Sequence, residues 1–277
     1  MKTANQQSMI RKPAKKSLLK RLFPFLLAGF LVLAVLFLPS FHLQSIELPD
    51  QLRTLTQEQL RSASGLLPGQ HLFCELGGSI RLLTALRYGP VEERIKSHFP
   101  TVRDVAVTLD FPGAIRIFLE ERVEVAWLTI PDGCVMIDKE GVALKICKEP
   151  PDGIPVIEGL QVRSMILGRP LEVDQTESLS RAISLLGSII EADKDPRPKT
   201  NLLAQIKGIR PISGRTLYLT LIIPETGEEM TVLAEIRSGQ TEDMLWLRFA
   251  LDQSVLAGRG KGILDLTGDR RTFVPDS

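Results

Sequence analysis

The side chains that could perform acid–base or metal chemistry are few and scattered in this chain. Its 277 residues include three histidines, His42, His71 and His98, and their spacings do not match the H-x-x-x-H pattern of a zinc site. His42 follows a long apolar stretch, His71 lies in a segment without periodicity, and His98 stands just before a proline. We interpret all three as surface or loop histidines.

Motifs for nucleophilic or phosphate chemistry are incomplete. Ser17-Leu18-Leu19-Lys20 has the S-x-x-K spacing of penicillin-interacting enzymes but lacks their companion motifs. The segment 258–262 is glycine-rich without being a phosphate-binding loop, and Asp132, Asp138 and Asp152 belong to turn sequences. The sequence predicts no catalytic residue, no metal site and no cofactor. A hydrolase using paired carboxylates such as Glu120 and Glu121 stays open as an alternative.

The cysteines allow two interpretations. Cys74, Cys134 and Cys147 are an odd number and form no C-x-x-C motif. One disulfide, between Cys134 and Cys147, and a set of free thiols are both compatible with the spacing.

An apolar stretch dominates the N-terminal part of the chain. Residues 22–41 contain no charged residue, and as a helix they would extend about 30 Å, the thickness of the bilayer hydrocarbon. We predict a single transmembrane helix here. A cleaved signal peptide is the competing interpretation, but the stretch is long for one and no A-x-A-like site follows it.

Charge predicts the orientation of this helix. Residues 1–21 form a basic tail without acidic residues: Lys2, Arg11, Lys12, Lys15, Lys16, Lys20 and Arg21. Basic flanks stay in the cytoplasm, so the N-terminus is predicted inside and residues 42–277 outside the cell membrane. Of 34 Lys and Arg residues, 27 remain in that outer part against 33 Asp and Glu. This acidic balance argues against nucleic acid as a partner.

Periodicity predicts an α+β fold in which a compact unit is followed by a strand-rich one. In residues 42–122 we expect a strand at 42–48 and a helix opened by a Thr56–Gln59 capping box. Helical segments at 80–86 and 91–99, interrupted by Gly89-Pro90, and a hairpin of 105–109 with 115–119 should follow. This gives a β-α-α-β-β order.

Residues 123–277 are predicted to form a mixed β domain with two flanking helices. Strands are expected at 125–130, 134–137, 142–146, 204–209, 217–223, 230–236, 262–266 and 271–274. One helix should run from about Thr176 to Ala192, with Leu179, Ile183, Leu186 and Ile190 on one face. The other should begin at Thr241 as N-cap, with Met244, Leu247, Leu251 and Val255 as its stripe and Gly258 as its C-cap.

The order of these segments resembles the bacterial cell-division family called DivIB or FtsQ. The resemblance rests on Leu43-Gln44-Ser45-Ile46-Glu47, the Leu55–Leu60 helix start, Pro68–Phe73, the hairpin from Pro112 to Glu120-Glu121-Arg122, Val135–Val142, Ile154–Gly159 and Gly262–Leu266. It implies a POTRA-like domain over 42–122 and a β domain over 123–277. It also implies a non-enzymatic scaffold at the division septum.

The resemblance further implies a partner-binding C-terminal strand. A free sheet edge offers unpaired N–H and C=O groups to an incoming strand, although Arg270 and Arg271 could also blunt it. The expected contacts are Leu264, Leu266, Arg270, Arg271, Thr272, Phe273 and Val274, with the two arginines facing acidic partner residues. The implied partners are single-span division proteins of the FtsL and DivIC/FtsB type and, through them, the septal wall synthase complex. A membrane-anchored cell-wall enzyme and a POTRA-bearing translocation component are the alternatives.

Overall fold

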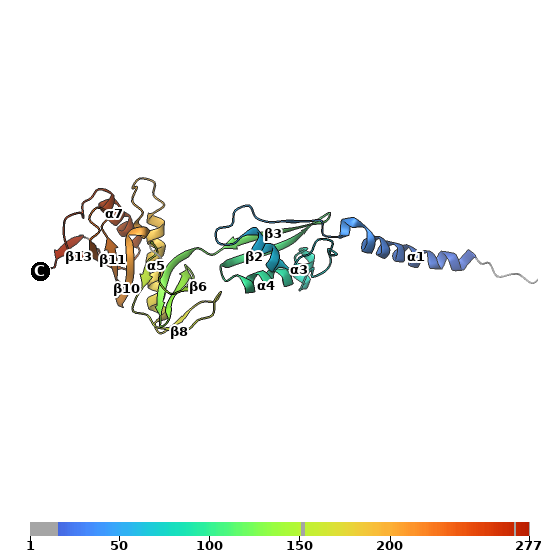
Figure 1. Ribbon diagram of the computed structural model, residues 1–277, viewed down its shortest axis with the longest axis horizontal. Coiled ribbons are helices and arrows are strands. Elements are labelled where there is room, and N and C mark those ends of the chain that lie inside the picture. Colours follow the sequence, from blue (N-terminus) through green and yellow to red (C-terminus); the bar gives the residue numbers. More distant parts are fainter. Residues whose placement is uncertain (1–15, 151–152, 269, 277) are drawn as a thin grey trace, which may run out of the picture. The chain divides into compact units, whose positions relative to one another are not determined.

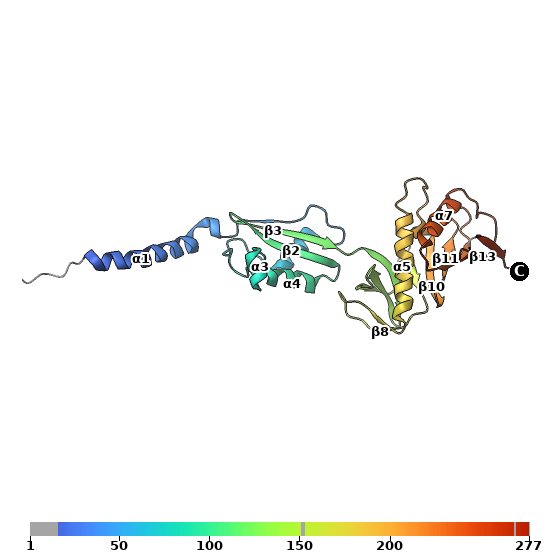
Figure 2. The same ribbon diagram turned by 180° about the vertical axis from the view of Figure 1, so that it is seen from behind.

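The computed structural model describes residues 16–150, 153–268 and 270–276 (Figures 1 and 2). The chain forms two compact units. The first comprises the residues up to 50 with 64–92 and 106–118, and the second comprises 51–63, 93–105 and 119–277. Most of the predicted cytoplasmic tail, residues 1–15, lies outside the described residues.

The apolar stretch forms a helix that is shorter at its C-terminal end than predicted. Helix α1 is Lys16–Phe37, and a separate 3-10 turn, η1, covers Pro39–Phe41. Leu38 is extended (ψ 131°), the conformation that a following proline favours, so the helix ends before it. Within the part of the chain that the structure describes, no helix combines the length and apolarity needed to cross a membrane. The predicted transmembrane helix is therefore not confirmed.

A small sheet and three short helices follow. The sheet has the order β1-β3-β2, with β1 parallel to β3. The elements in chain order are β1 (Ser45–Glu47), α2 (Gln57–Ser64), α3 (Ile80–Thr84), α4 (Gly89–His98), β2 (Val102–Asp110) and β3 (Ala114–Glu121). The predicted hairpin is confirmed, and its turn needs Gly113 because the backbone there has φ +79°. The β-α-α-β-β order is confirmed with one additional short helix.

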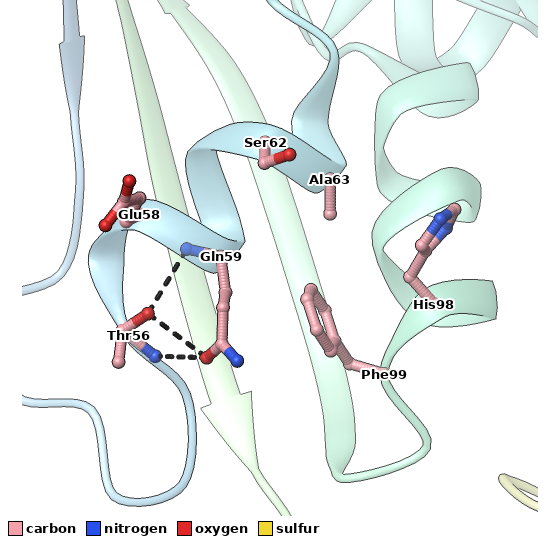
Figure 3. Close-up of a pocket in the computed structure, with 7 residues that line it drawn as sticks. All are labelled: Thr56, Glu58, Gln59, Ser62, Ala63, His98 and Phe99. Carbon is pink, nitrogen blue, oxygen red and sulfur yellow. Dashed lines mark hydrogen bonds between the residues drawn. The ribbon is translucent and has the colours of Figure 1, made fainter.

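Local sequence explains where these helices begin. The predicted capping box is present: the Gln59 N–H donates to Thr56 Oγ1 (3.2 Å), and the Thr56 N–H donates to Gln59 Oε1 (2.9 Å), as Figure 3 shows. We predicted that Gly89-Pro90 interrupts a helix, and this prediction is wrong: these two residues begin α4. Proline is well suited to a first helical turn because the N–H groups there have no helical acceptor.

The large sheet contains nine strands in the order β14-β13-β12-β11-β10-β7-β4-β5-β6. Its strands are β4 (Glu124–Ile130), β5 (Gly133–Asp138), β6 (Ala143–Cys147), β7 (Val156–Ile157), β10 (Ile206–Ser213), β11 (Thr216–Ile222), β12 (Glu229–Glu235), β13 (Gly262–Asp265) and β14 (Thr272–Pro275). Strand β7 is parallel to β4 and β10, and β13 is parallel to β12. A separate pair joins β8 (Val162–Ser164) to β9 (Glu172–Val173). The predicted strand at 204–209 begins at Ile206, after the short helix α6 (Leu202–Gln205).

Helices α5 (Thr176–Ala192) and α7 (Gln240–Asp252) share one apolar core with the large sheet. They pack against each other through this core, and the Thr241 hydroxyl donates to the Ser188 hydroxyl at 3.2 Å. The predicted bounds of α5 and the buried positions Met244, Leu247 and Leu251 of α7 are confirmed. The N-cap of α7 is Gly239 rather than Thr241, and Val255 lies beyond the helix and is exposed, so both of those predictions are wrong.

A buried arginine fixes the position of α7. Arg248 is 5% exposed, and its guanidinium donates to the backbone carbonyls of Ala192, Asp195, Pro198 and Thr200 at 2.6–2.8 Å. These carbonyls follow the end of α5, where helical acceptors have no partner of their own. One side chain on α7 therefore satisfies the backbone that leaves α5.

Candidate partner-binding edge

Strand β14 is an edge of the large sheet. It pairs on one side only, antiparallel to β13, with Ile263 opposite Val274 and Leu264 opposite Phe273. Figure 1 shows β13 close to the C-terminal end of the chain. The edge that the sequence could only suggest is present among the described residues.

The backbone of β14 presents alternate groups to β13 and to the outside. The Asp276 N–H donates to the Lys261 carbonyl at 3.0 Å. Because hydrogen-bonded and non-hydrogen-bonded pairs alternate in antiparallel strands, Thr272 and Val274 also bond to β13. The N–H and C=O of Phe273 and the C=O of Pro275 then point away from the sheet. These are the groups that an added strand would use.

The predicted contact residues divide into buried and exposed ones. Leu264 and Leu266 are 2% and 1% exposed and belong to the core of the sheet, so their side chains cannot meet a partner as we predicted. Phe273 is partly buried against the same core, opposite Leu264. Thr272 and Val274 project to the other face, and Val274 is 59% exposed. Of the five predicted contact residues other than the arginines, Thr272 and Val274 are therefore the two whose side chains are accessible to a partner.

The two arginines before β14 differ in their surroundings. Arg270 is exposed. Arg271 is instead held by α7: its Nη2 lies 3.1 Å from Asp243 Oδ1, and its guanidinium lies 5.3 Å from the Trp246 ring centre. The second oxygen of Asp243 accepts from Arg237 at 2.7 Å. The prediction that Arg271 faces acidic partner residues is therefore not supported, because its acidic neighbour lies within the chain.

Residues outside the prediction contribute to the edge. Pro275 leaves β14 without a second outward donor, and proline is a typical residue of edge strands for that reason. A proline in a strand-like segment near the C-terminus was the available signal. Asp243 is only 4% exposed and forms ion pairs with Arg237 and Arg271. Its role depends on a contact between α7 and the segment before β14. No local pattern in the sequence indicates such a contact.

Comparison with known proteins addresses the rest of the chain. Residues 41–122 match the family model described as POTRA domain, FtsQ-type. Over these residues the chain is similar to an FtsQ-type POTRA domain. This match confirms the predicted resemblance to the DivIB/FtsQ family over these residues.

One similar solved structure is the major extracytoplasmic domain of the trans isomer of the cell-division protein DivIB from Geobacillus stearothermophilus. It is 17% identical, with a TM-score of 0.29, and the match covers 48% of this chain and 94% of that chain. No curated protein matches this chain.

A groove within residues 41–122 bears on the enzyme alternative. Its lining comes from α2 and the end of α4: Thr56, Glu58, Gln59, Ser62, Ala63, His98 and Phe99. Figure 3 shows Ala63 pointing toward Phe99, and its dashed lines join only Thr56 and Gln59. His98 Nδ1 lies 3.2 Å from the Arg94 carbonyl oxygen, so the ring contacts its own helix. The described residues of this groove do not connect a hydroxyl, an imidazole and a carboxylate.

The other residues singled out for chemistry are also placed by the structure. His42 and His71, although separated in sequence, lie together with ring centres 5.2 Å apart. Cys134 and Cys147 face each other across β5 and β6 as free thiols, which is the second of the two predicted interpretations. Burial and, secondarily, Cys147 raise the pKa of the Cys134 thiol. Among the described residues no cluster of three His, Cys, Asp or Glu side chains could hold a metal ion.

Proposed function

We propose that this protein is a non-enzymatic scaffold of the cell-division machinery. In this proposal the segment 22–41 anchors it in the cell membrane with the N-terminus in the cytoplasm, and the remainder acts outside the membrane. It would bind single-span division proteins of the FtsL and DivIC/FtsB type and so help to assemble septal wall synthesis. The FtsQ-type POTRA match over residues 41–122 is the observation that carries the proposal.

The binding mode that we propose is the addition of a strand to β14. An extended partner segment would accept from the Phe273 N–H and donate to the carbonyls of Phe273 and Pro275. A net gain of about 0.5–1.5 kcal/mol per hydrogen bond makes such a short edge weak by itself. Contacts to the exposed Val274 side chain and to Thr272 would add to it.

Confinement to one membrane would compensate for a weak edge. Two proteins anchored in the same bilayer meet at a raised effective concentration, so modest affinity is sufficient for assembly. A scaffold of this kind needs no catalytic group.

The proposal is tested first by location. An N-terminal fluorescent fusion in dividing cells of the source organism should form a band at midcell that appears with constriction. Copurification of a DivIC/FtsB-type protein with the full chain should accompany it. An even distribution around the cell, with no division protein copurified, would contradict the scaffold and favour the cell-wall enzyme or translocation alternatives.

A further inference from the structure

We infer that the first unit docks on a lipid surface through three phenylalanine rings beside the end of α1. These rings, Phe41, Phe73 and Phe111, are called the ring patch below. The inference rests on the proposed membrane anchoring and adds a second, specific lipid contact to it.

The ring patch joins three segments that are far apart in the sequence. Phe41 ends η1, Phe73 lies in the loop before α3, and Phe111 lies in the turn between β2 and β3. The Phe41 ring centre is 6.0 Å from that of Phe73 and 5.6 Å from that of Phe111. Phe73 and Phe111 are nevertheless 48% and 58% exposed. Exposed aromatic rings that are gathered in one place are unfavourable on a surface that faces only water. The ring patch therefore indicates an apolar partner.

Hydrogen bonds fix the patch at the level of the last turn of α1. His71 Nε2 lies 3.1 Å from the Val35 carbonyl oxygen, within α1. The Leu72 N–H donates to the Phe41 carbonyl at 2.8 Å. The loop that carries Phe73 therefore contacts both α1 and the turn after it. If this end of α1 meets lipid, the ring patch meets it at the same depth.

The pattern of exposed side chains on α1 favours lipid over a partner helix. The large apolar side chains that are exposed on the described part of α1 are Leu22, Phe23, Phe25, Leu26, Leu27, Phe30, Leu31, Val32, Leu33 and Phe37. Positions 25–27 and 30–33 are consecutive, so they cover all sides of the helix rather than one stripe. A single partner helix covers one stripe, whereas lipid surrounds a helix that is apolar on all sides.

The geometry thus points to an interfacial contact. Phenylalanine and leucine side chains at membrane surfaces are typically buried about 5–10 Å, at the boundary of headgroups and acyl chains. Because apolar burial drives such contact, it should be nearly independent of salt, unlike a basic patch on anionic lipid.

The experiment uses the full chain in phosphatidylcholine vesicles that contain a lipid with a doxyl quencher near the headgroup. Cys74 is exposed and adjacent to Phe73, so it accepts an environment-sensitive fluorophore in a Cys147→Ser background, where the remaining Cys134 is buried. We expect the label at Cys74 to be quenched by the doxyl lipid, at low and at high salt. Phe73→Ser with Phe111→Ser should reduce the quenching to the level found in vesicles that lack the doxyl lipid. Phe73→Leu with Phe111→Leu should retain it.

A label on α1 separates this inference from the anchoring proposal. An Ala28→Cys label, made with Cys74→Ser, should be quenched whenever the chain is anchored. Quenching at residue 28 with none at Cys74 would overturn docking and leave the anchoring intact. No association with vesicles at all would overturn both. An emission change of the Cys74 label without quenching, appearing only after a second single-span protein is added, would assign the patch to a partner helix and overturn the lipid contact.

Discussion

The two edges of the large sheet are protected in different ways. At β6, the Ala143 N–H donates to the Arg169 carbonyl at 3.0 Å, and its own carbonyl accepts from Gly168 at 2.7 Å. The Lys145 side chain forms an ion pair with Glu124 at 2.8 Å and lies 5.8 Å from the Trp127 ring centre. The loop at Gly168 and Arg169 therefore covers part of this edge, which is how proteins commonly prevent unwanted strand pairing, while the Lys145 side chain reaches inward to β4.

At β14 the protection is much lighter. The strand has four residues, and among them Pro275 removes one outward donor. Among the described residues, no loop forms a backbone hydrogen bond with the outward N–H and C=O groups of Phe273. The neighbouring arginine, Arg271, is occupied by Asp243 and Trp246 rather than guarding the edge. The difference suggests that β14 is the edge available for binding, and four predictions test this, in descending order of their effect on partner capture.

Removing residues 271–277 should reduce capture of the DivIC/FtsB-type partner to background. The deletion removes β14 but leaves the buried Leu264 in β13 and the buried Leu266 just after that strand, so the second unit should still unfold cooperatively. Copurification and thermal unfolding by circular dichroism measure the two effects. Capture by a folded, truncated protein would rule out β14 as the binding edge.

Proline substitutions in β14 should distinguish its outward and inward groups. Phe273→Pro removes the outward donor, and we expect capture about two- to thirteenfold weaker than in Phe273→Ala, the value of one hydrogen bond of about 0.5–1.5 kcal/mol. The alanine variant controls for loss of the ring. Val274→Pro removes a bond to β13 and should instead lower the unfolding temperature. Equal affinity of Phe273→Pro and Phe273→Ala would show that this N–H is not used.

Asp243→Asn should weaken capture only a few-fold but destabilise the second unit. It leaves Arg237 and Arg271 without their carboxylate, and we expect a loss of about 1–3 kcal/mol in the free energy of unfolding, as for a buried hydrogen-bonded group that loses its partner. Urea denaturation measures it. Glu242→Gln, one residue before on the same helix, is the matched control. Unchanged stability in Asp243→Asn would mean that the contact does not hold the segment before β14.

Lys145→Thr should have the smallest effect. It removes the exposed ion pair at β6, which contributes about 0–1 kcal/mol, and should leave partner capture unchanged within experimental error. Surface plasmon resonance against the same partner measures this. A marked loss of capture would indicate that the partner uses the β6 edge, and would reverse the comparison of the two edges.

The sequence by itself determined the features that depend on neighbours along the chain. The Thr56–Gln59 capping box, the hairpin around Gly113 and the bounds of α5 all follow from local hydrogen bonding, backbone conformation or helical periodicity. The resemblance to the DivIB/FtsQ family likewise followed from the order of short motifs. Errors remained where local signals conflict, as at Gly89-Pro90, which can either end a helix or begin one.

Only the tertiary structure decided which surfaces are available. Alternation along 262–266 does not reveal that Leu264 and Leu266 face a core shared with α5 and α7, because both faces of a strand can be buried. The position of β14 at the edge, the occupation of Arg271 by Asp243, and the convergence of Phe41, Phe73 and Phe111 all join distant parts of the chain. Such contacts follow from packing of the whole fold, which no local pattern encodes.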